Sequence, residues 1–535
     1  MTSNIIRLKE ALGASEYAAI DSFCAKHKGQ ECLAELGRFL KDKFSLEVTL
    51  DPDIVAGFKT DSSNLRGEAK GLCRLSTERE CAIVLRACHK AGIPVTVSAG
   101  KSNLTGSATP NGGVIVSTTK MLKPEVRVSA DGQSVEAPVG MILEDMRRAV
   151  LEQTQGKVMY PVDPTSRGDA TVGGTIACNA SGFVPGEAGA TRQWVKSIDF
   201  LFPNGLKARA ERGEFVSADG KFVLEHKGGK TELPVPTYRR PTIKNAGGPY
   251  SRPDGKMDFV DFVIGSEGIF GVVTACTLKL TPRPAQYLDL FFSLAEEKNA
   301  LAFYFYLRNK LEGNLGRLTA FEYFGVNSRR HMDHEERLFR GDDKVAIYLQ
   351  APLTDQSVED AAGEWLEALV AADCGINEEA ILLLDNDRDR QILLEARHSL
   401  PANALEVVQH RGTYTIMTDT AVPPERFAEF LEFNHKLLAA ERLDYVAFGH
   451  FGDCHLHFTI LPETAQLERA TEVYDMIVAK SAELGGVYSG EHGTGKRKRK
   501  DFLRCYGEAA VREVKRCKAA VDPELLLNRG NVVEA

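Results

Sequence analysis

Three separate loops made of small residues constrain the fold of this chain most strongly. The first, Ser98–Gly106 (SAGKSNLTG), follows an apolar run that predicts a strand. The second is Thr171–Gly182 (TVGGTIACNASG), and the third is Ile264–Thr274 (IGSEGIFGVVT). Small residues let backbone approach a bound molecule closely, and the N–H groups of such loops suit a pyrophosphate. Taken alone, the first loop also fits an ordinary tight turn, because it is neither G-x-G-x-x-G nor a P-loop. Together the three predict one extended ligand across several elements of an α+β domain.

Length and charge set limits on the class of protein. A chain of 535 residues is too long for one ordinary core, so at least two domains are expected. Its 66 Lys and Arg and 74 Asp and Glu give a net charge of −8, which argues against nucleic-acid binding. We find no apolar run long enough for a transmembrane segment and no apolar signal region, so a cytoplasmic location is expected. The 11 cysteines form no C-x-x-C pair and are expected to be reduced thiols.

Apolar periodicity predicts the elements outside the loops. Leucines at three- and four-residue steps predict an N-terminal helical extension within residues 1–50. Residues 355–372 and 424–440 are predicted to be helices, with strands such as 345–350 beside them. The stretch 205–258 is polar and rich in Gly, Pro and Lys, which predicts loops or an insertion. An α+β protein of two domains fits these patterns best.

A cluster of histidines and one glutamate suggests a metal site. Residues 445–460 (YVAFGHFGDCHLHFTI) predict a hairpin, which brings His450 beside the strand that carries His455 and His457. His455 and His457 are two residues apart and share one face of that strand. Glu491 lies downstream in a Gly-rich turn, SGEHGTG. Two imidazoles and a carboxylate suit a divalent ion such as zinc, manganese or iron. From composition alone, polar surface histidines remain an alternative.

The order of the small-residue motifs resembles a known flavoprotein family. "SAGKSNLTG", "YPVDPTSRGDATVGGTIACNASG", "GATRQWV" and "IGSEGIFGVVT" resemble the FAD-binding domain of the vanillyl-alcohol oxidase and p-cresol methylhydroxylase family. The resemblance implies an α+β fold with that FAD-binding domain and an α+β substrate (cap) domain. The first loop has no His or Cys, so the FAD is expected to be non-covalent. The implied FAD-binding residues are Gly100, Lys101, Ser102, Asn103, Gly106, Asp163, Gly173, Gly174, Asn179 and Val273.

The histidine motifs resemble one branch of this family. "GHFGDCHLHF" and "SGEHGTG" are similar to motifs of the FAD-linked D-lactate, glycolate and D-2-hydroxyglutarate dehydrogenases. The match implies that the metal ligands are His450, His457 and Glu491, and that His492 is the catalytic base. Cys454 and His455 depart from the family pattern, which leaves His455 as an added ligand or a hydrogen-bonding residue. "AVDPELLLNRGN" also resembles the end of these enzymes.

Two further cations are assigned by the same resemblance. Arg397 matches a carboxylate-binding arginine, and a guanidinium can grip a carboxylate through two hydrogen bonds. The alternative is a helix-surface arginine paired with Glu395 or Asp389. Lys244-Asn245 resembles a flavin-proximal pair. The resemblance divides the chain into a helical extension (1–50), an FAD-binding domain (51–283), a substrate domain with the metal site (284–505) and a C-terminal segment returning to the FAD domain (506–535).

The implied activity is oxidation of a small D-2-hydroxy acid to the 2-oxo acid. Met417-Thr418-Asp419 stands where relatives acting on a longer diacid carry a lysine, which favours a lactate-sized substrate. D-2-hydroxyglutarate and glycolate remain alternatives, as do a non-redox enzyme similar to alkyl-dihydroxyacetone-phosphate synthase and a non-catalytic FAD-binding subunit. The electron acceptor is left open between a quinone, a cytochrome and an electron-transfer flavoprotein, and a homodimer is compatible with the sequence.

The basic run Lys496–Lys500 has two interpretations. We expect a solvated helix face that follows the catalytic turn. The alternative is a patch that docks an anionic lipid surface or an acidic electron-transfer partner, which leaves peripheral membrane contact open.

Overall fold

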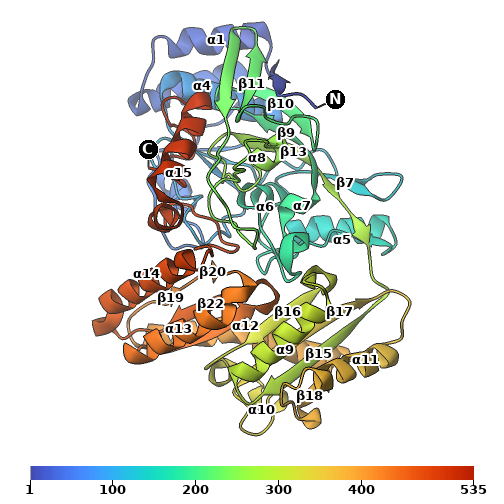
Figure 1. The fold of residues 1–535 in the computed structure, drawn as a ribbon. Helices are drawn as coiled ribbons and strands as arrows, with labels where there is room; N and C mark the ends of the chain where they lie inside the picture. The colour runs from blue at the N-terminus through green and yellow to red at the C-terminus, as the bar shows by residue number, and fades with distance from the viewer. Residues whose placement is uncertain (1, 535) are drawn as a thin grey trace.

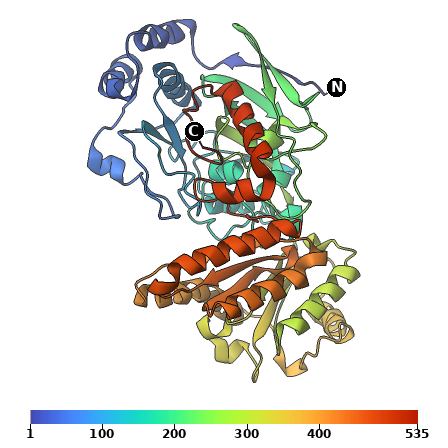
Figure 2. The same ribbon diagram turned by 60° about the vertical axis from the view of Figure 1, so that its left-hand side comes forward.

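The computed structural model describes residues 2–534, which form two units, one above the other in Figure 1. The first unit contains the chain up to Pro282 and the C-terminal helix α15, and the second begins with the strand at Gln286. Figure 2 shows α15 lying over the first unit, with the second unit below it. The C-terminal segment therefore returns to the N-terminal part of the chain. No helix within residues 2–534 is long and apolar enough to cross a membrane.

The helices of the first unit surround several small sheets. They are α1 (Ala14–Cys24), α2 (Leu33–Phe44), α3 (Pro52–Ala56), α4 (Glu78–Ala91), α5 (Leu143–Gln153), α6 (Val172–Cys178), α7 (Thr191–Trp194), α8 (Phe259–Val263) and α15 (Arg499–Val521). One sheet has the order β2 (Lys9–Glu10), β10 (Leu206–Glu211), β9 (Val195–Leu201), β13 (Val272–Lys279), β7 (Ser134–Ala137), β6 (Arg127–Val128). The others are β3 (Gly71–Arg74), β5 (Val114–Ser117) with β4 (Val95–Ser98), then β1 (Ile5–Arg7), β11 (Lys221–His226) with β12 (Gly229–Pro234), and β14 (Thr281–Pro282) with β8 (Val158–Met159).

Helix α4 and strand β4 place the first small-residue loop. The Thr77 hydroxyl accepts a hydrogen bond from the Glu80 backbone N–H and caps the start of the helix. Gly92, with φ of 72°, ends it in the left-handed conformation that favours glycine. The chain then enters β4, which pairs in parallel with β5 in a buried sheet. The loop after Ser98 thus begins at the carboxyl end of a rigid strand.

The expectation of loops over 205–258 is wrong for its first part. Residues 206–234 contain the three strands β10, β11 and β12, which pair into two sheets. Strand β10 alternates, burying Ala208 and Ala210 while its charged neighbours face outward. The polar composition therefore reflects sheets with one solvated face. Residues 235–258 contain no helix or strand, in line with the expectation. The N-terminal extension is largely helical but also supplies strands β1 and β2.

The second unit is a sheet covered by helices on both faces. Its order is β18 (Ile381–Leu383), β15 (Gln286–Leu294), β17 (Val345–Leu353), β16 (Ala320–Phe324), β21 (Tyr445–His450), β22 (His455–Ile460), β19 (Ile416–Met417), with β20 (Thr420–Ala421) also on β22. The helices on one face are α9 (Glu297–Lys310), α11 (Val358–Ala371), α13 (Phe427–Ala440) and α14 (Leu467–Glu483). The other face packs against α10 (Glu335–Leu338) and α12 (Asp387–His410). Neighbouring residues Phe291 and Phe292 belong to opposite cores, as strand alternation requires.

The predicted hairpin and two predicted helices are confirmed. Strands β21 and β22 pair antiparallel, with His450 opposite His455, and their turn is a short 3-10 helix that ends at Cys454 with φ of 51°. Helices α11 and α13 lie within the predicted ranges 355–372 and 424–440. The histidines are therefore carried by two central strands of the second unit.

A buried ion pair holds the returning C-terminal segment. The Lys518 ammonium lies 3.2 Å from the Asp522 carboxylate and donates to the Ile269 carbonyl at 3.1 Å. Both side chains are almost wholly buried. Asn528 donates to the Gly268 carbonyl and accepts from the Val97 N–H. Helix α15 and the residues after it therefore contact the third small-residue loop and the strand that precedes the first loop.

Replacing Lys518 should destabilise the protein strongly. Lys518→Met leaves the Asp522 carboxylate buried without its cation, which typically costs about 3–5 kcal/mol in the free energy of unfolding. Thermal and urea-induced unfolding, followed by circular dichroism, will measure the loss. Lys436→Met is the matched control, because Lys436 forms an exposed pair with Glu432 and its loss should leave the transition unchanged. Equal stability of the two variants would contradict this prediction.

Candidate active site

The small-residue loops enclose a cavity of about 440 Å³. Residues from all three loops line it, and so do His450, Glu491 and His492 from the second unit's strands and the turn that follows them. The cavity therefore joins the predicted cofactor site to the predicted catalytic site.

Glycines in these loops allow segments to lie against one another. A Cβ atom on Gly100 would stand 2.2 Å from the Asp169 carbonyl oxygen, and one on Gly173 would stand 2.8 Å from the Val139 Cβ. A Cβ on Gly174 meets only the Thr171 hydroxyl at 3.2 Å and the Ala99 Cβ at 3.4 Å. Gly100 and Gly173 are thus required for packing, whereas Gly174 keeps space open beside the cavity.

Most of the first-loop residues that were predicted to bind the cofactor line the cavity. Gly100, Lys101, Ser102 and Asn103 line the cavity, while Gly106 packs against Leu65 outside it. The Lys101 ammonium donates to the Gly57 carbonyl at 2.7 Å and lies 4.8 Å from the centre of the Phe58 ring. The Asn103 amide donates to Asp61 at 2.9 Å. The Lys101 charge is thus turned toward residues 57 and 58.

Some of the other residues that were predicted to bind FAD line the cavity and some do not. Gly173, Gly174 and Val273 line the cavity, but Asp163 and Asn179 do not. The Asp163 carboxylate accepts from the Phe183 N–H at 3.1 Å, and burial raises its pKa to about 6. The Asn179 side chain accepts from the Arg192 N–H at 2.9 Å. Both side chains hold the backbone of the cavity wall in place.

The predicted metal ligands converge on Glu491. Its two carboxylate oxygens lie 3.0 Å from the His450 Nε2 and 3.2 Å from the His457 Nε2. The other nitrogen of His450 is 2.6 Å from Glu322, and that of His457 is 3.2 Å from the Thr418 carbonyl oxygen. An oxygen atom behind each imidazole, with the other ring nitrogen turned toward a carboxylate ligand, is the usual arrangement around a metal. The residues therefore fit a divalent cation.

The charges around this cluster are closely balanced. Burial alone would lower the pKa of His450, but the Glu322 carboxylate outweighs it and raises that pKa to about 9. Burial would raise the pKa of Glu491, but His450 and Lys244 hold it well below its usual range. The Lys244 ammonium lies 3.4 Å from Glu491 and 3.2 Å from Asp453. Each buried carboxylate in this cluster thus faces a cation.

A second set of possible metal ligands includes His455. Asp419, His455, His457 and Glu491 offer ligand atoms that lie within 4.8 Å of one another. However, the His455 Nε2 is bonded to Asp419 at 2.8 Å, and Asp419 is bonded to the Lys498 ammonium at 2.6 Å. Burial lowers the pKa of His455 to about 4. Because Asp419 and His455 already bond to each other and to Lys498, the set His450, His457 and Glu491 suits a cation better.

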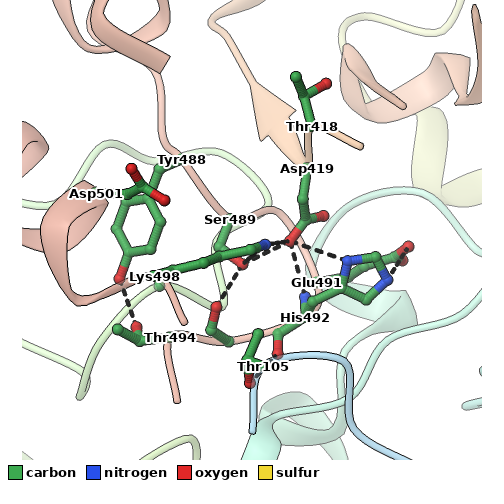
Figure 3. A network of polar contacts seen from close by, with 12 residues as sticks. Thr105, Thr418, Asp419, Tyr488, Ser489, Glu491, His492, Thr494, Lys498 and Asp501 are labelled. Carbon is green, nitrogen blue, oxygen red and sulfur yellow. Dashed lines mark hydrogen bonds and ion pairs between the residues drawn. The ribbon is translucent and has the colours of Figure 1, made fainter. Parts of the chain in front are cut away.

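His492 lies beside this cluster. Its Nε2 is 3.5 Å from Glu491, and its Nδ1 is 3.2 Å from Asp419. Figure 3 shows Ser489, Lys498 and His492 turned toward Asp419. The ring is one-fifth exposed, the most open of the functional side chains in this cluster. Of its two ring nitrogens, Nε2 is the one that faces the predicted metal ligand Glu491.

Arg397 is mostly buried and does not lie free on the helix surface. Its Nε and Nη2 atoms donate to one oxygen of Glu322 at 3.1 and 2.9 Å, and its guanidinium lies 5.4 Å from the Phe183 ring centre. Pairing with Glu395 or Asp389 is therefore excluded. Arg397 does not line the cavity, although Phe183 does. Glu322 thus links Arg397 to His450.

Sequence reasoning missed two buried carboxylates and misjudged the basic run. Glu322 stands inside the apolar strand AFEYF, and a charge at such a position is the signal that could have revealed it. Glu267 accepts hydrogen bonds from the Thr494 and Gly495 N–H groups at 2.6 and 2.7 Å. Burial raises the pKa of Glu267 to about 7. The expected solvated face at 496–500 is wrong for Lys498, which is buried against Asp419.

Comparisons with known proteins identify the family of this chain. A family model described as FAD binding domain matches residues 69–210, and one described as FAD linked oxidases, C-terminal domain, matches residues 326–532. A D-lactate dehydrogenase of Anaerostipes hadrus is 26% identical over 91% of this chain and 94% of its own length. A D-2-hydroxyglutarate dehydrogenase of Xanthomonas citri pv. viticola is 26% identical over 85% of this chain and 87% of its own.

Solved structures share the fold at low identity. An alkyldihydroxyacetonephosphate synthase has a TM-score of 0.63 and 14% identity, covering 98% of this chain and 88% of its own. A 4-ethylphenol oxidase from Gulosibacter chungangensis has a TM-score of 0.64 and 15% identity, covering 98% of both chains. Together with the two family models, these likenesses confirm the expected fold class, an α+β FAD-binding domain joined to a second α+β domain.

Filling the cavity at Gly174 should prevent FAD binding. Gly174→Leu introduces a side chain among the cavity-lining residues Ala99 and Thr171 without a backbone clash at its Cβ. We expect purified protein to have lost its flavin absorbance while circular dichroism stays unchanged. Gly168→Leu is the matched control, because a Cβ there meets nothing within 4 Å and the residue does not line the cavity. Full flavin content in Gly174→Leu would overturn the assignment of this cavity.

Proposed function

The chain belongs to the FAD-linked oxidases, and from that membership we propose that it oxidises a small D-2-hydroxy acid to the corresponding 2-oxo acid. The observation that carries the proposal is the cluster of His450, His457, Glu491 and His492, three of which line the cavity between the small-residue loops. It combines a metal-ligand set with a possible base within one hydrogen-bonded group.

The FAD is proposed to be non-covalent and to occupy the cavity. Backbone at Gly100–Asn103 and at Gly173–Gly174 lines the cavity and offers N–H groups of the kind that hold a diphosphate. Lys101 supports this through its backbone, because its side chain is bonded elsewhere. When bound, FAD supplies an acceptor for the hydride that leaves C2 of the substrate.

A divalent cation is proposed to be held by His450, His457 and Glu491. Glu322 and the Thr418 carbonyl oxygen orient the two imidazoles for this purpose. Such a cation lowers the pKa of a bound hydroxyl group and fixes its position. Zinc, manganese and iron each suit a set of two nitrogens and one carboxylate.

His492 is proposed to take the hydroxyl proton at its Nε2. This nitrogen lies 3.5 Å from the Glu491 carboxylate, so a hydroxyl held near Glu491 lies within its reach. The proton passes to the imidazole, the C2 hydrogen leaves with its electron pair as hydride, and the carbon–oxygen double bond of the 2-oxo acid forms.

Arg397 is proposed to bind the substrate carboxylate, with a change from the expected geometry. Two of its five N–H donors, one on Nε and one on Nη2, are bonded to Glu322, which leaves the second N–H of Nη2 and the two of Nη1 for a carboxylate. Contact through Nη1 preserves the pair. The Phe183 ring lines the cavity and lies 5.4 Å from the guanidinium, so Arg397 is next to a residue of the cavity wall.

A lactate-sized monocarboxylate is the proposed substrate class. Met417 offers no charge to a second carboxylate, whereas the relatives compared here are named for both D-lactate and D-2-hydroxyglutarate. The electrons then leave the flavin for an acceptor other than NAD.

Removing one metal ligand should remove the metal and spare the flavin. We expect close to one transition metal per chain by elemental analysis of protein purified without chelator. His457→Ala should lose that metal while keeping FAD. His410→Ala is the control, because His410 is exposed on α12 and contacts only Glu406. Rapid substrate-dependent flavin reduction in demonstrably metal-free protein would refute the metal's role.

Anaerobic mixing with 2-hydroxy acids tests the reaction itself. D-lactate should bleach the flavin absorbance, and L-lactate should not, with glycolate and D-2-hydroxyglutarate as competing candidates. His492→Ala should slow bleaching by about 10²–10⁴-fold while substrate binding is kept, because only the base is lost. Arg397→Ala should mainly weaken binding, by about 1.5–3 kcal/mol. A flavin that no 2-hydroxy acid reduces would refute the proposed function.

A further inference from the structure

One buried carboxylate, Asp419, connects the predicted base to the basic run (Figure 3). Asp419 is 1% exposed, and its two oxygens accept hydrogen bonds from several groups. One oxygen is 2.8 Å from the His455 Nε2. The other is 2.6 Å from the Lys498 ammonium, 2.6 Å from the Ser489 hydroxyl and 3.2 Å from the His492 Nδ1. Asp419 thus gathers a cation, a hydroxyl group and two imidazoles.

We propose that Asp419 is the positioning residue for His492: it keeps the imidazole proton on Nδ1 and directs Nε2 at the substrate hydroxyl, with Lys498 as its fixed counter-charge. The inference rests on the proposed function, in which His492 is the base.

The geometry of His492 supports this role. An ionised carboxylate only accepts hydrogen bonds, so the proton between Asp419 and His492 belongs to Nδ1. The His492 backbone N–H also donates to Asp419, at 3.1 Å, so one carboxylate holds both ends of the residue. Nε2 lies farther from its carboxylate, 3.5 Å from Glu491, and the oxygens of Glu491 are already engaged by His450 and His457, so Nε2 is the nitrogen left without the proton. A base needs its lone pair on the side of the proton that it takes, and this tautomer puts it there.

The surrounding turn leaves His492 little freedom. On one side, Ser489 bonds both Asp419 and the Gly493 carbonyl, and the Gly490 N–H donates to the Asp419 carbonyl. On the other side, the Thr494 and Gly495 N–H groups donate to Glu267. The backbone that carries His492 is therefore anchored before and after it. A fixed backbone and a fixed Nδ1 together determine where Nε2 points.

Lys498 explains how Asp419 stays charged in a buried site. Its ammonium contacts only Asp419 and, at 3.2 Å, Ser489 among the described residues. Burial alone would raise the pKa of Asp419, but His492 and Lys498 hold it well below its usual range. When His492 takes a proton, the carboxylate faces the imidazolium and stabilises it. This arrangement gives the basic run a role inside the protein.

A purely structural role for Asp419 is the alternative, since removing it leaves Lys498 buried without a partner. Two variants separate the two roles. Asp419→Asn removes the charge, so we expect flavin reduction at saturating substrate to slow by about 10–100-fold, with the substrate dissociation constant little changed. Its melting temperature should fall, because Lys498 is left unpaired.

The double variant Asp419→Asn/Lys498→Met removes both charges of the pair. We expect it to regain the melting temperature and FAD content of the wild type but not the rate of flavin reduction. Recovery of the rate together with stability would overturn the proposal, because Asp419 would then act only by balancing Lys498. Asp501→Asn is the matched control: Asp501 is a buried aspartate bonded to Tyr474, and its replacement should not change the rate.

A measurement without substrate keeps this inference separate from the proposed function. Nitrogen-15 NMR of histidine-labelled, FAD-loaded protein should show His492 with a protonated Nδ1 and a bare Nε2, assigned by loss of the signal in His492→Gln. Asp419→Asn should weaken that preference. A wild-type His492 with its proton on Nε2 would overturn the inference even if D-lactate reduces the flavin. A flavin that no 2-hydroxy acid reduces, with the Nδ1 proton in place, would refute only the function.

Discussion

Two buried carboxylates, one from each unit, hold the turn that carries the predicted base. Glu267 of the first unit accepts the Thr494 and Gly495 N–H groups, and Asp419 of the second accepts from Ser489 and His492. Burying a carboxylate is unfavourable unless hydrogen bonds and cations compensate it, so the turn and the two units have to come together in one arrangement. The position of His492 therefore depends on the contact between the units.

Buried carboxylates also connect the residues around the predicted metal ligands. Strand β16 supplies Glu322, which bonds both His450 and Arg397, and Glu491 then bonds His450 and His457. Because each carboxylate is shared between two or more partners, single substitutions in this cluster are expected to be non-additive. The contrast between Asp419→Asn and its double variant with Lys498→Met uses that coupling directly.

Much of the fold and part of the site could be predicted from the sequence. The small-residue loops and the hairpin of residues 445–460 are local patterns, and the structure has both. Residues 206–234 were misjudged because strands with one solvated face carry the same polar residues as loops. Lys498 was misjudged because a run of five basic residues resembles a solvated helix face, and its buried partner lies 79 residues away.

By itself, the sequence determined the family, the order of the small-residue loops and the two short motifs that contain the histidines and Glu491, because these depend on residue type and spacing along the chain. Only the tertiary structure decided which oxygen atoms stand behind each imidazole, that Arg397 is already paired with Glu322, and that Lys498 faces inward. Those outcomes depend on distances between residues far apart in sequence, because a buried charge is stabilised only by the opposite charges and hydrogen-bonding groups that the fold places beside it.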